Sequence, residues 1–489
     1  MDKNDLYNAF DKIDPALVTR SEEGNCFAEK KAKRSFAEKG RGRMIIPLII
    51  VPLAVIAAIA AISVISYNNR APGDKTLTGP ESNTSIISPV ETPGEVIENP
   101  VNIRFLTDTG FTSSRKINEL SHNFSDAYAS ISLELLGNIY ETGSPSVISP
   151  MSIITSVGLT ACGARGKTQD TIFNWLGMEN DIDVLNDQLY SFRERFENGS
   201  VPVFSEANGV FLTERDDFIV NNEFLDLVKN TFRAQIAQLD FGNAAAADAL
   251  NKWINDSTNG IVPALFKNGD VNYNTVMVLA NSVCFDAEWD EPFTASWKYN
   301  FHGSSGDKKV KVMASSEHLF IDGSNETGFI KTYKGGQFGF AALLPREGII
   351  IEDYVKGLEG NTFTNLIKEA ESLEKVDIVV PSFSVDTSLD LRKLFKEIGL
   401  EELFSEDADF GGFGHMDDGS GVGLGKILHG TKLEVFETGT RAGSSSVVTV
   451  TAAATEAPGV EKIILDRPFV FSIIDMDTGL PLFIGVYDC

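Results

Sequence analysis

Cysteine is scarce in this chain, with four residues in 489. Cys26, Cys162, Cys284 and Cys489 are too widely scattered for a disulfide framework, and no Cys-x-x-Cys pair points to a structural zinc site. Cys162 and Cys284 lie in apolar runs, where we expect buried thiols. The cysteine pattern therefore predicts neither a disulfide-stabilised scaffold nor a metal centre.

Recognisable catalytic motifs are missing as well. The sequence has no Gly-x-Ser-x-Gly elbow, no His-Glu-x-x-His, no Walker loop and no dinucleotide fingerprint. None of the five histidines has a neighbouring pattern that marks a general base. We therefore expect a protein that is not an enzyme and that needs no metal or other cofactor.

Basic residues are few relative to acidic ones. There are 42 Lys and Arg residues against 69 Asp and Glu residues, which gives a net charge of −27. This charge excludes nucleic acid as an expected partner and disfavours direct binding to an anionic membrane surface. The excess of acidic residues lies after residue 43.

One long apolar run, residues 44–67, contains 24 residues and no charge. As a helix it is long enough to cross a bilayer of about 30 Å, and the Lys and Arg residues before it should keep the N-terminus in the cytoplasm. We therefore expect a cytoplasmic segment at 1–43, a transmembrane helix at 44–67 and an extracellular remainder, which makes a single-pass protein of the cell membrane. Cleavage and secretion is the alternative, although the run exceeds the roughly 7–15 apolar residues of a usual signal peptide.

Residues 68–104 are rich in Pro, Ser, Thr and Gly and have no sustained apolar period, which is typical of a tether. The remaining residues, 105–489, should form one folded domain. Helical spacing and β-prone runs both occur within it, so we expect the α+β class. The helical patterns cover 117–140, 151–164 and 244–259, and the β-prone runs cover 276–285, 338–344, 376–380 and 470–474.

The stretch from Glu437 to Phe471 contains small, β-prone residues between turn signals. Alternation along it places Thr440, Ala442 and the following even-numbered residues on one face, and Arg441 on the other. The segment is thus suited to enter a sheet with one face buried.

Several motifs in unbroken order resemble the serpins, the serine protease inhibitor family. The resemblance covers about residues 105–489, which is more specific than any single motif. The motifs that carry it are Val147-Ile-Ser149-Pro150-Met-Ser152-Ile, Asn251-Lys-Trp253 through Gly260, Leu279-Ala-Asn281 through Trp289 and Phe293, Pro381-Ser-Phe383, Leu400 through Phe410, and Asp466-Arg-Pro-Phe469.

The resemblance implies a large central mixed sheet A, two smaller sheets, about nine helices and an exposed reactive loop. Inhibitory members trap serine or cysteine proteases after the loop is cut, and the segment that begins at Glu437 occupies the place of that loop. The resemblance also implies a polar cluster under the sheet opening and an aromatic ring at its top. These positions are Ser149, Ser152, Asn281 and His429 for the cluster and Trp289 for the ring.

The hinge of the loop has the small residues that rapid insertion into a sheet requires. Gly439 allows a bend and Thr440 is the first inward-facing residue. Two departures from the family pattern are Arg441, where Glu is usual, and Ser382, where some members have a Lys that could pair with the hinge Glu. The expected hinge consists of Glu437, Gly439, Thr440, Ala442, Gly443, Ser444, Ser445 and Ser446.

Counting from Glu437 as in inhibitory members places the reactive bond at Ala453-Ala454, within an interval from Thr451 to Ala457. Small residues around it disfavour trypsin-like proteases, which require Arg or Lys. We expect an elastase-like target, with subtilisin-like enzymes second and cysteine proteases as a further class. The alternatives are a non-inhibitory serpin that serves as a surface binding module, and a membrane-anchored hydrolase, which no motif favours.

Overall fold

The computed structural model describes residues 57–66, 102–107, 115–197, 204–257, 264–441 and 460–489. Within these ranges the chain forms nine α-helices and one 3₁₀ helix. The helices are α3 (His122–Ile139), α4 (Pro150–Gly163), α5 (Gly166–Leu176), α6 (Ile182–Glu197), α7 (Asn222–Phe232), α8 (Ala246–Ser257), α9 (Ile351–Gly357), α10 (Gly360–Lys368), α11 (Leu391–Glu397) and η1 (Glu401–Phe404).

The strands form a first sheet of nine members in the order β2-β6-β4-β7-β1-β16-β17-β8, with β14 also paired to β16. The β4–β6 pair is parallel and the other pairs are antiparallel, so the sheet is mixed. Its strands are β2 (Arg104–Phe105), β6 (Gln235–Leu239), β4 (Phe204–Thr213), β7 (Thr275–Phe285), β1 (Ala57–Ser66), β16 (Gly423–Phe436), β17 (Gly439–Arg441), β8 (Ala287–Glu288) and β14 (Phe383–Asp390).

A second sheet also has nine strands, in the order β18-β13-β10-β11-β12-β19-β20-β3, with β9 paired to β10. Strands β5 (Phe218–Val220) and β15 (Gly414–Met416) form a separate two-stranded sheet. The strands of the second sheet are β18 (Glu461–Ile464), β13 (Glu371–Pro381), β10 (Gly306–Asp322), β11 (Glu326–Thr332), β12 (Phe338–Pro345), β19 (Phe469–Asp475), β20 (Pro481–Tyr487), β3 (Ser146–Ile148) and β9 (Ala295–Gly303).

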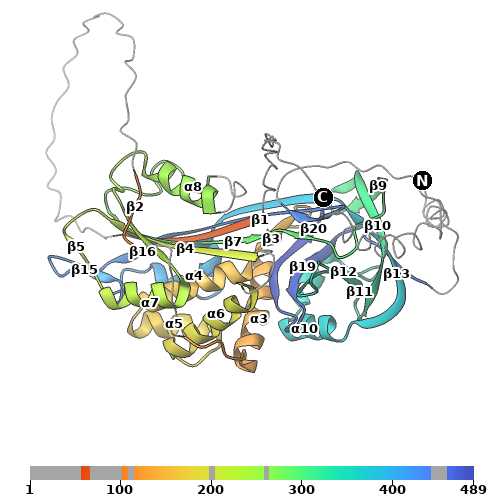
Figure 1. Cartoon of the computed structure of the whole chain (residues 1–489), viewed down its shortest axis with the longest axis horizontal. Coiled ribbons are helices and arrows are strands. Elements are labelled where there is room, and N and C mark those ends of the chain that lie inside the picture. The colour runs from red at the N-terminus through yellow and green to blue at the C-terminus, as the bar shows by residue number, and fades with distance from the viewer. Residues whose placement is uncertain (1–56, 67–101, 108–114, 198–203, 258–263, 442–459) are drawn as a thin grey trace, which may run out of the picture.

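Figure 1 shows the first sheet as a long layer with helices α3 to α7 beneath it and α8 on its other side. The core lies between the sheets and the helices. Every residue of β12, β19 and β20 is buried, which agrees with their continuous apolar sequences, because a strand covered on both faces does not alternate.

Helix α4 lies directly under the first sheet and packs against β1 and β7. It begins with Pro150, which has the fixed φ suited to a first turn, and the Ser149 side chain caps it by accepting a hydrogen bond from the Ser152 N–H at 3.2 Å. All 14 of its residues are buried, as expected for a helix that is apolar on every side.

The α+β class predicted from the sequence is confirmed. The three expected helices correspond to α3, α4 and α8, with small shifts at their ends. The four β-prone runs lie in β7, β12, β13 and β19. The expected cytoplasmic segment 1–43 and nearly all of the expected linker 68–104 lie outside the described residues.

The expectation of a membrane-spanning helix at 44–67 is wrong. Residues 57–66 of this run form strand β1, which pairs along both edges inside the first sheet. Within the described ranges, no helix combines the length and the apolar character needed to cross a bilayer. The predicted single-pass placement at the cell membrane is therefore corrected. The physical reason is that an uncharged run of Ile, Val and Ala suits a central strand of a sheet as well as a helix.

Candidate functional site

The connection between β16 and β17 turns the chain back into the first sheet. β16 ends at Phe436, and β17 pairs on both sides, with Thr440 opposite Val435 of β16 and Ala287 of β8. A Cβ atom at Gly439 would collide with the carbonyl oxygen of Ala287. Close backbone approach, rather than a positive φ, therefore requires glycine at the start of the hinge.

Thr440 is completely buried, and its side-chain oxygen lies 2.6 Å from the hydroxyl of Tyr333. Burial raises the pKa of Tyr333 well above its ordinary value, so this phenol stays protonated and available for the hydrogen bond. The structure thus places Thr440 inside the first sheet, and its role as an inward-facing hinge residue stays a prediction.

The carboxylate of Glu437 forms an ion pair with Lys311 of β10. The Glu437 side chain is 11% exposed and the Lys311 side chain 41%. The carbonyl oxygen of Glu437 accepts a hydrogen bond of 2.9 Å from the Phe293 N–H. Ser382 instead donates its hydroxyl to the carbonyl oxygen of Val435, at 3.2 Å. The cation that pairs with Glu437 is therefore Lys311, on a strand of the second sheet, and not a side chain at position 382.

Trp289 packs beside the end of β16 and is hydrogen-bonded to its last residue. The ring is fully buried and stacks on Tyr333, with centroids 4.4 Å apart. Its indole N–H donates to the carbonyl oxygen of Phe436 at 2.9 Å, and its backbone N–H donates to that of Thr438 at 3.1 Å. The residue expected at the top of the sheet opening thus binds the turn that leads into the hinge.

A buried lysine lies behind this aromatic ring. Lys331 of β11 contacts the carboxylate of Glu317 and donates to the carbonyl oxygen of Glu291 at 2.7 Å. Its Nζ atom lies 4.7 Å from the centroid of the Phe293 ring and 5.5 Å from that of Trp289. Burial lowers the pKa of Lys331 and raises the pKa of Glu317. Removing either partner would leave an uncompensated buried group.

Lys311, Lys331, Glu317 and Tyr333 were not identified from the sequence. They lie on or directly after β10 and β11, which are more than 100 residues from the hinge in the chain. No short motif surrounds them. A lysine in an otherwise apolar run, as in Gly328-Phe-Ile-Lys331, was the one available signal.

The expected polar cluster begins at the N-terminus of α4. The Ser149 hydroxyl donates to the carbonyl oxygen of Leu482 at 2.8 Å while it caps the helix. Ser152 is fully buried, and its Oγ atom has no hydrogen-bond partner among the described residues. These two serines lie together, as their spacing of three residues at a helix start requires.

Asn281 and His429, the other two members, lie on β7 and β16 and are fully buried. Strand β1 separates them, because Ala61 pairs with both residues. Two strand spacings amount to about 10 Å, so the side chains are not placed for a direct hydrogen bond across the sheet. The structure therefore brings each of them to the same level of the sheet but not to each other.

Each of these two side chains has one satisfied and one unsatisfied atom. The Asn281 amide donates to Asn208 Oδ1 at 2.8 Å, and His429 Nε2 lies 2.7 Å from Thr431 Oγ1. Asn281 Oδ1 and His429 Nδ1 have no partner in the part of the chain that the structure describes. Buried polar atoms without partners are rare, so this level of the sheet is incompletely satisfied.

The other expected site residues lie outside the described residues. They are Ala442, Gly443, Ser444, Ser445 and Ser446 of the hinge, and Ala453 and Ala454 of the reactive bond. Across the described ranges, no group of three or more His, Cys, Asp or Glu residues is placed to hold a metal ion.

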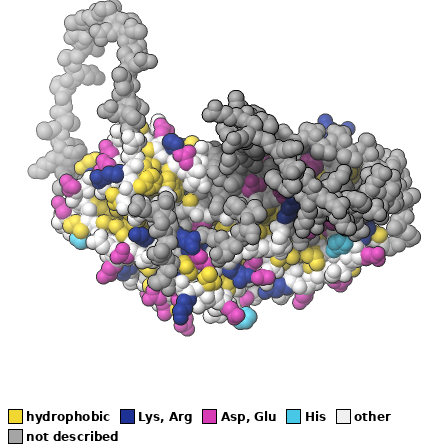
Figure 2. Space-filling view, in the orientation of Figure 1, with side chains coloured by type: hydrophobic (Ala, Val, Ile, Leu, Met, Phe, Trp, Pro, Cys, Tyr) yellow, Lys and Arg dark blue, Asp and Glu magenta, His cyan; other side chains and the backbone are white. Residues whose placement is uncertain are grey.

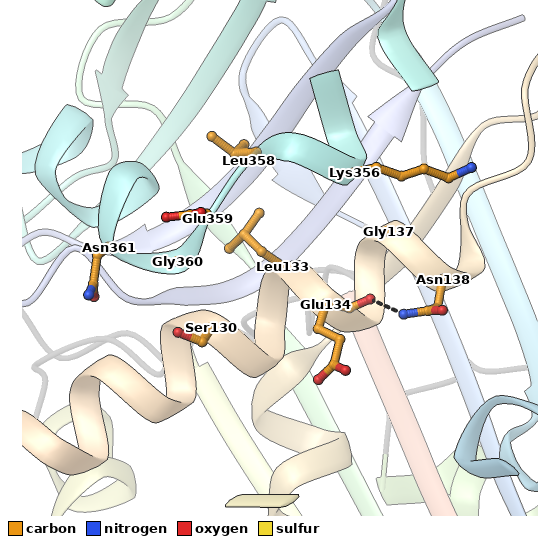
Figure 3. A pocket seen from close by; sticks show the side chains of 10 residues that line it. All are labelled: Ser130, Leu133, Glu134, Gly137, Asn138, Lys356, Leu358, Glu359, Gly360 and Asn361. Carbon is orange, nitrogen blue, oxygen red and sulfur yellow. Dashed lines mark hydrogen bonds between the residues drawn. The ribbon is translucent and has the colours of Figure 1, made fainter. Parts of the chain in front are cut away.

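A pocket lies between α3 and the connection from α9 to α10 (Figure 3). Leu133 and Leu358 are among the residues that line it, with the backbone at Gly137 and Gly360. The Asn138 amide near its edge donates to a carbonyl oxygen of its own helix at 2.8 Å. None of the lining residues belongs to the hinge or to the polar cluster, so the pocket is a separate feature.

The structure thus combines a large mixed sheet, a short strand after β16 that pairs inside that sheet, and buried polar residues at the start of α4 and on β7 and β16. Residues 126–489 match the family model for serpins, described as serine protease inhibitors. The chain belongs to the serpin family. Protease inhibition is the general activity of this family, with serine proteases as the general class of target.

Individual relatives agree with this assignment. The chain is 30% identical over 384 residues to human neuroserpin, an alignment that covers 74% of this chain and 90% of that protein. It is 28% identical to an uncharacterized serpin-like protein of Thermococcus kodakarensis, over 74% of this chain and 84% of that protein.

Solved structures agree too, and they confirm the expected fold. The native state of tengpin, a thermophilic serpin, matches with a TM-score of 0.70 and 29% identity, covering 80% of this chain and 100% of tengpin. The latent state of the same protein matches with a TM-score of 0.66 and 28% identity, over 76% and 99%.

The ion pair between Glu437 and Lys311 predicts a stability effect. Replacement Lys311→Met should lower the free energy of unfolding by about 1 kcal/mol, because Glu437 would lose its partner while Lys311 is too exposed for a larger effect. Hydrogen exchange at residues 439–441 should accelerate. Lys311→Arg keeps the charge and should behave like the parent. Equal stability and exchange in Lys311→Met and the parent would contradict this role.

Burial lowers the pKa of His429 from 6.5 to about 3. The unfolded chain therefore takes up a proton near pH 6.5 that the folded chain refuses, so stability is lost as the pH falls from about 6.5 towards 3. His429→Gln should reduce the loss of stability between pH 7 and pH 4, measured by chemical denaturation. The exposed His415→Gln is the control and should leave that loss unchanged; an unchanged loss in His429→Gln would disprove the prediction.

Proposed function

We propose that this chain is an irreversible suicide-substrate inhibitor of serine proteases with elastase-like specificity. It acts by cleavage of the reactive loop followed by insertion of the cut loop into the first sheet. The observation that carries the proposal is the buried position of Thr440. This residue pairs with β16 on one side and β8 on the other, so the chain enters the sheet between the strands that would flank the inserted loop.

The chemistry begins as an ordinary proteolysis. The serine Oγ of the protease attacks the carbonyl carbon of Ala453, the bond to Ala454 breaks, and the new amine leaves with a proton from the catalytic histidine. An ester between protease and inhibitor remains. If the loop moves into the sheet before water attacks this ester, the protease is carried away from the loop's original position and its active site is distorted. Hydrolysis then stops at the covalent intermediate.

Insertion has a physical driving force. A loop strand between β7 and β16 would make ladder hydrogen bonds on both edges, each worth about 0.5–1.5 kcal/mol net. These bonds would replace the ladder bonds that β1 makes there, so the gain from insertion rests on how well the loop residues fit the site. The small residues from Ala442 to Ser446 need little space, and alternation leaves Arg441 on the opposite face from Thr440. The uncut chain is then a kinetically trapped state that cleavage releases.

Specificity follows from the residues around the reactive bond. Ala453 and Ala454 are flanked by Thr and Ala, and no Arg or Lys lies between Thr451 and Ala457. A small, shallow pocket such as that of elastase accepts these side chains, whereas an acidic trypsin-like pocket gains nothing from them. Subtilisin-like proteases are the second class of target, and cysteine proteases a further one.

Charge adds to recognition over a longer range. The net charge of −27 should attract basic proteases through long-range steering. Figure 2 shows acidic and basic side chains interspersed on the visible face, without a single-sign patch. On this face, therefore, no local charged patch adds to the attraction that the net charge provides.

A non-inhibitory binding role is the second candidate, and one observation favours it. Strand β1 already lies between β7 and β16, in the path that the loop would take. If β1 never leaves, the cut loop cannot enter, and a protease would hydrolyse the ester and depart. The chain would then be a substrate rather than an inhibitor.

Thr440→Arg tests the inhibitory mechanism. A charged side chain at this buried position should block insertion, so the variant should be cleaved by elastase without the SDS-resistant complex that the parent forms. Thr449→Arg is the matched control, because alternation places it on the opposite face, and it should still form the complex. Cleavage of the parent without any covalent complex would leave the non-inhibitory role as the function.

Ala453→Arg tests the position of the bond. Trypsin-like proteases prefer Arg, so this variant should form a covalent complex with trypsin that the parent does not form. Sequencing the released C-terminal peptide should give Ala454 as its first residue, for the parent with elastase and for the variant with trypsin. A different first residue would show that the reactive bond is not Ala453-Ala454.

A further inference from the structure

Strand β1 has the position and the direction that an inserted loop would have. It runs antiparallel to β7, from Ala57 opposite Phe285 to Ser66 opposite Thr275. It also runs antiparallel to β16 on its other edge. Figure 1 shows β1 in red among the long strands of this sheet. Both neighbours therefore have a paired edge that is supplied by a segment from the N-terminal part of the chain.

The register shows that β1 and the loop compete for the same place. Arg441 of β17 pairs with Glu434, so three further residues in an antiparallel ladder would bring Ser444 opposite Thr431. Ile59 pairs with Thr431. The other edge gives the same result, because continuation from Thr440 opposite Ala287 would bring Ala442 opposite Phe285, the partner of Ala57. Residues 57–65 thus take the register positions of loop residues 442–450.

The two segments also share their residue types. Residues 57–65 read Ala-Ala-Ile-Ala-Ala-Ile-Ser-Val-Ile, and residues 442–450 read Ala-Gly-Ser-Ser-Ser-Val-Val-Thr-Val. Both lack charge and proline, begin with small residues and end with mostly β-branched ones. Both therefore suit a strand that enters the centre of a sheet.

The polar cluster distinguishes the two occupants. Ala61 lies between Asn281 and His429, where Asn281 Oδ1 and His429 Nδ1 have no partner among the described residues. The loop residue at the same register position is Ser446. A hydroxyl there can donate to the amide oxygen and accept from the imidazole N–H. The loop is thus the better match for the cluster, and β1 is an incomplete substitute for it.

We propose that the space between β7 and β16 is a strand-binding site that the chain's own residues 57–66 fill before cleavage. These residues must leave before the loop can enter, and they therefore set the rate at which a protease is trapped. The consequence for trapping rests on the proposed inhibitory function. The occupancy itself rests on the pairing of β1 alone.

A disulfide across one register pair tests both statements in the full chain. Val64 pairs with Val278, and antiparallel partners are close enough for a disulfide. Val64→Cys with Val278→Cys should form this bond on oxidation, identified by peptide mapping with the native cysteines in place. Val64→Cys with Met277→Cys is the matched control. Met277 is the next position on β7, where side chains point to the opposite face, so this pair should not form a bond.

The locked chain should be cleaved by elastase without forming a covalent complex, and reduction of the disulfide should restore the complex. Failure of the Val64–Val278 disulfide to form, or equal formation in the control pair, would contradict the placement of β1 beside β7. A locked chain that forms the complex as well as the reduced chain would overturn the competition. If the bond forms but neither the parent nor the reduced chain makes a complex, the inhibitory function fails while the strand-binding site stands.

Substitutions at Ala61 test the competition in both directions. Ala61→Ser supplies the hydroxyl that the cluster lacks, so it should hold β1 in place and slow complex formation with elastase by about tenfold. Ala61→Arg should displace β1 and accelerate complex formation by a similar factor. Ala71→Ser and Ala71→Arg are matched controls outside β1. Equal rates for all variants, or slower trapping by both Ala61 variants, would contradict the proposal.

Discussion

The facing edges of β7 and β16 are the constraint on which the rest of this structure depends. Buried backbone N–H and C=O groups must be paired, and these two strands are long and lie in the middle of a covered sheet. In this structure the pairing is supplied by β1. β17 pairs with the same edge of β16, at residues 434–436, just beyond the part of β16 that pairs with β1. If the cut loop can take the place of β1, as proposed, this one space makes the sheet a switch between two arrangements.

Three contacts fix the chain between the end of β16 and β17. Glu437 is paired with Lys311, Trp289 binds the turn before the hinge, and Thr440 is hydrogen-bonded to Tyr333. Beside the middle of β1, at the level of Ala61, Asn281 and His429 have unsatisfied atoms, and in the proposed mechanism these atoms favour a hydroxyl-bearing strand over an alanine. In the proposed mechanism the hinge contacts fix where the loop begins its entry, and the unsatisfied polar atoms favour the loop once entry has begun.

Much of this was predictable from the sequence, where local chemistry decides. Ser149 and Pro150 define the start of α4, whereas the entry of the small residues after Gly439 into a sheet stays a prediction. The pairing of Glu437 with Lys311 was not predictable, because the two residues are brought together only by the docking of one sheet on the other. The apolar run at 44–67 was misassigned, since a strand in the centre of a sheet and a membrane helix can share the same apolar composition.

Hydrogen exchange of the full chain, before and after cleavage by elastase, tests the shared site most directly. Before cleavage, residues 57–66 should be protected and residues 442–451 should exchange rapidly. After cleavage the order should reverse, with the loop protected and residues 57–66 released. Continued protection of residues 57–66 after cleavage, with no protection of the loop, would contradict the account.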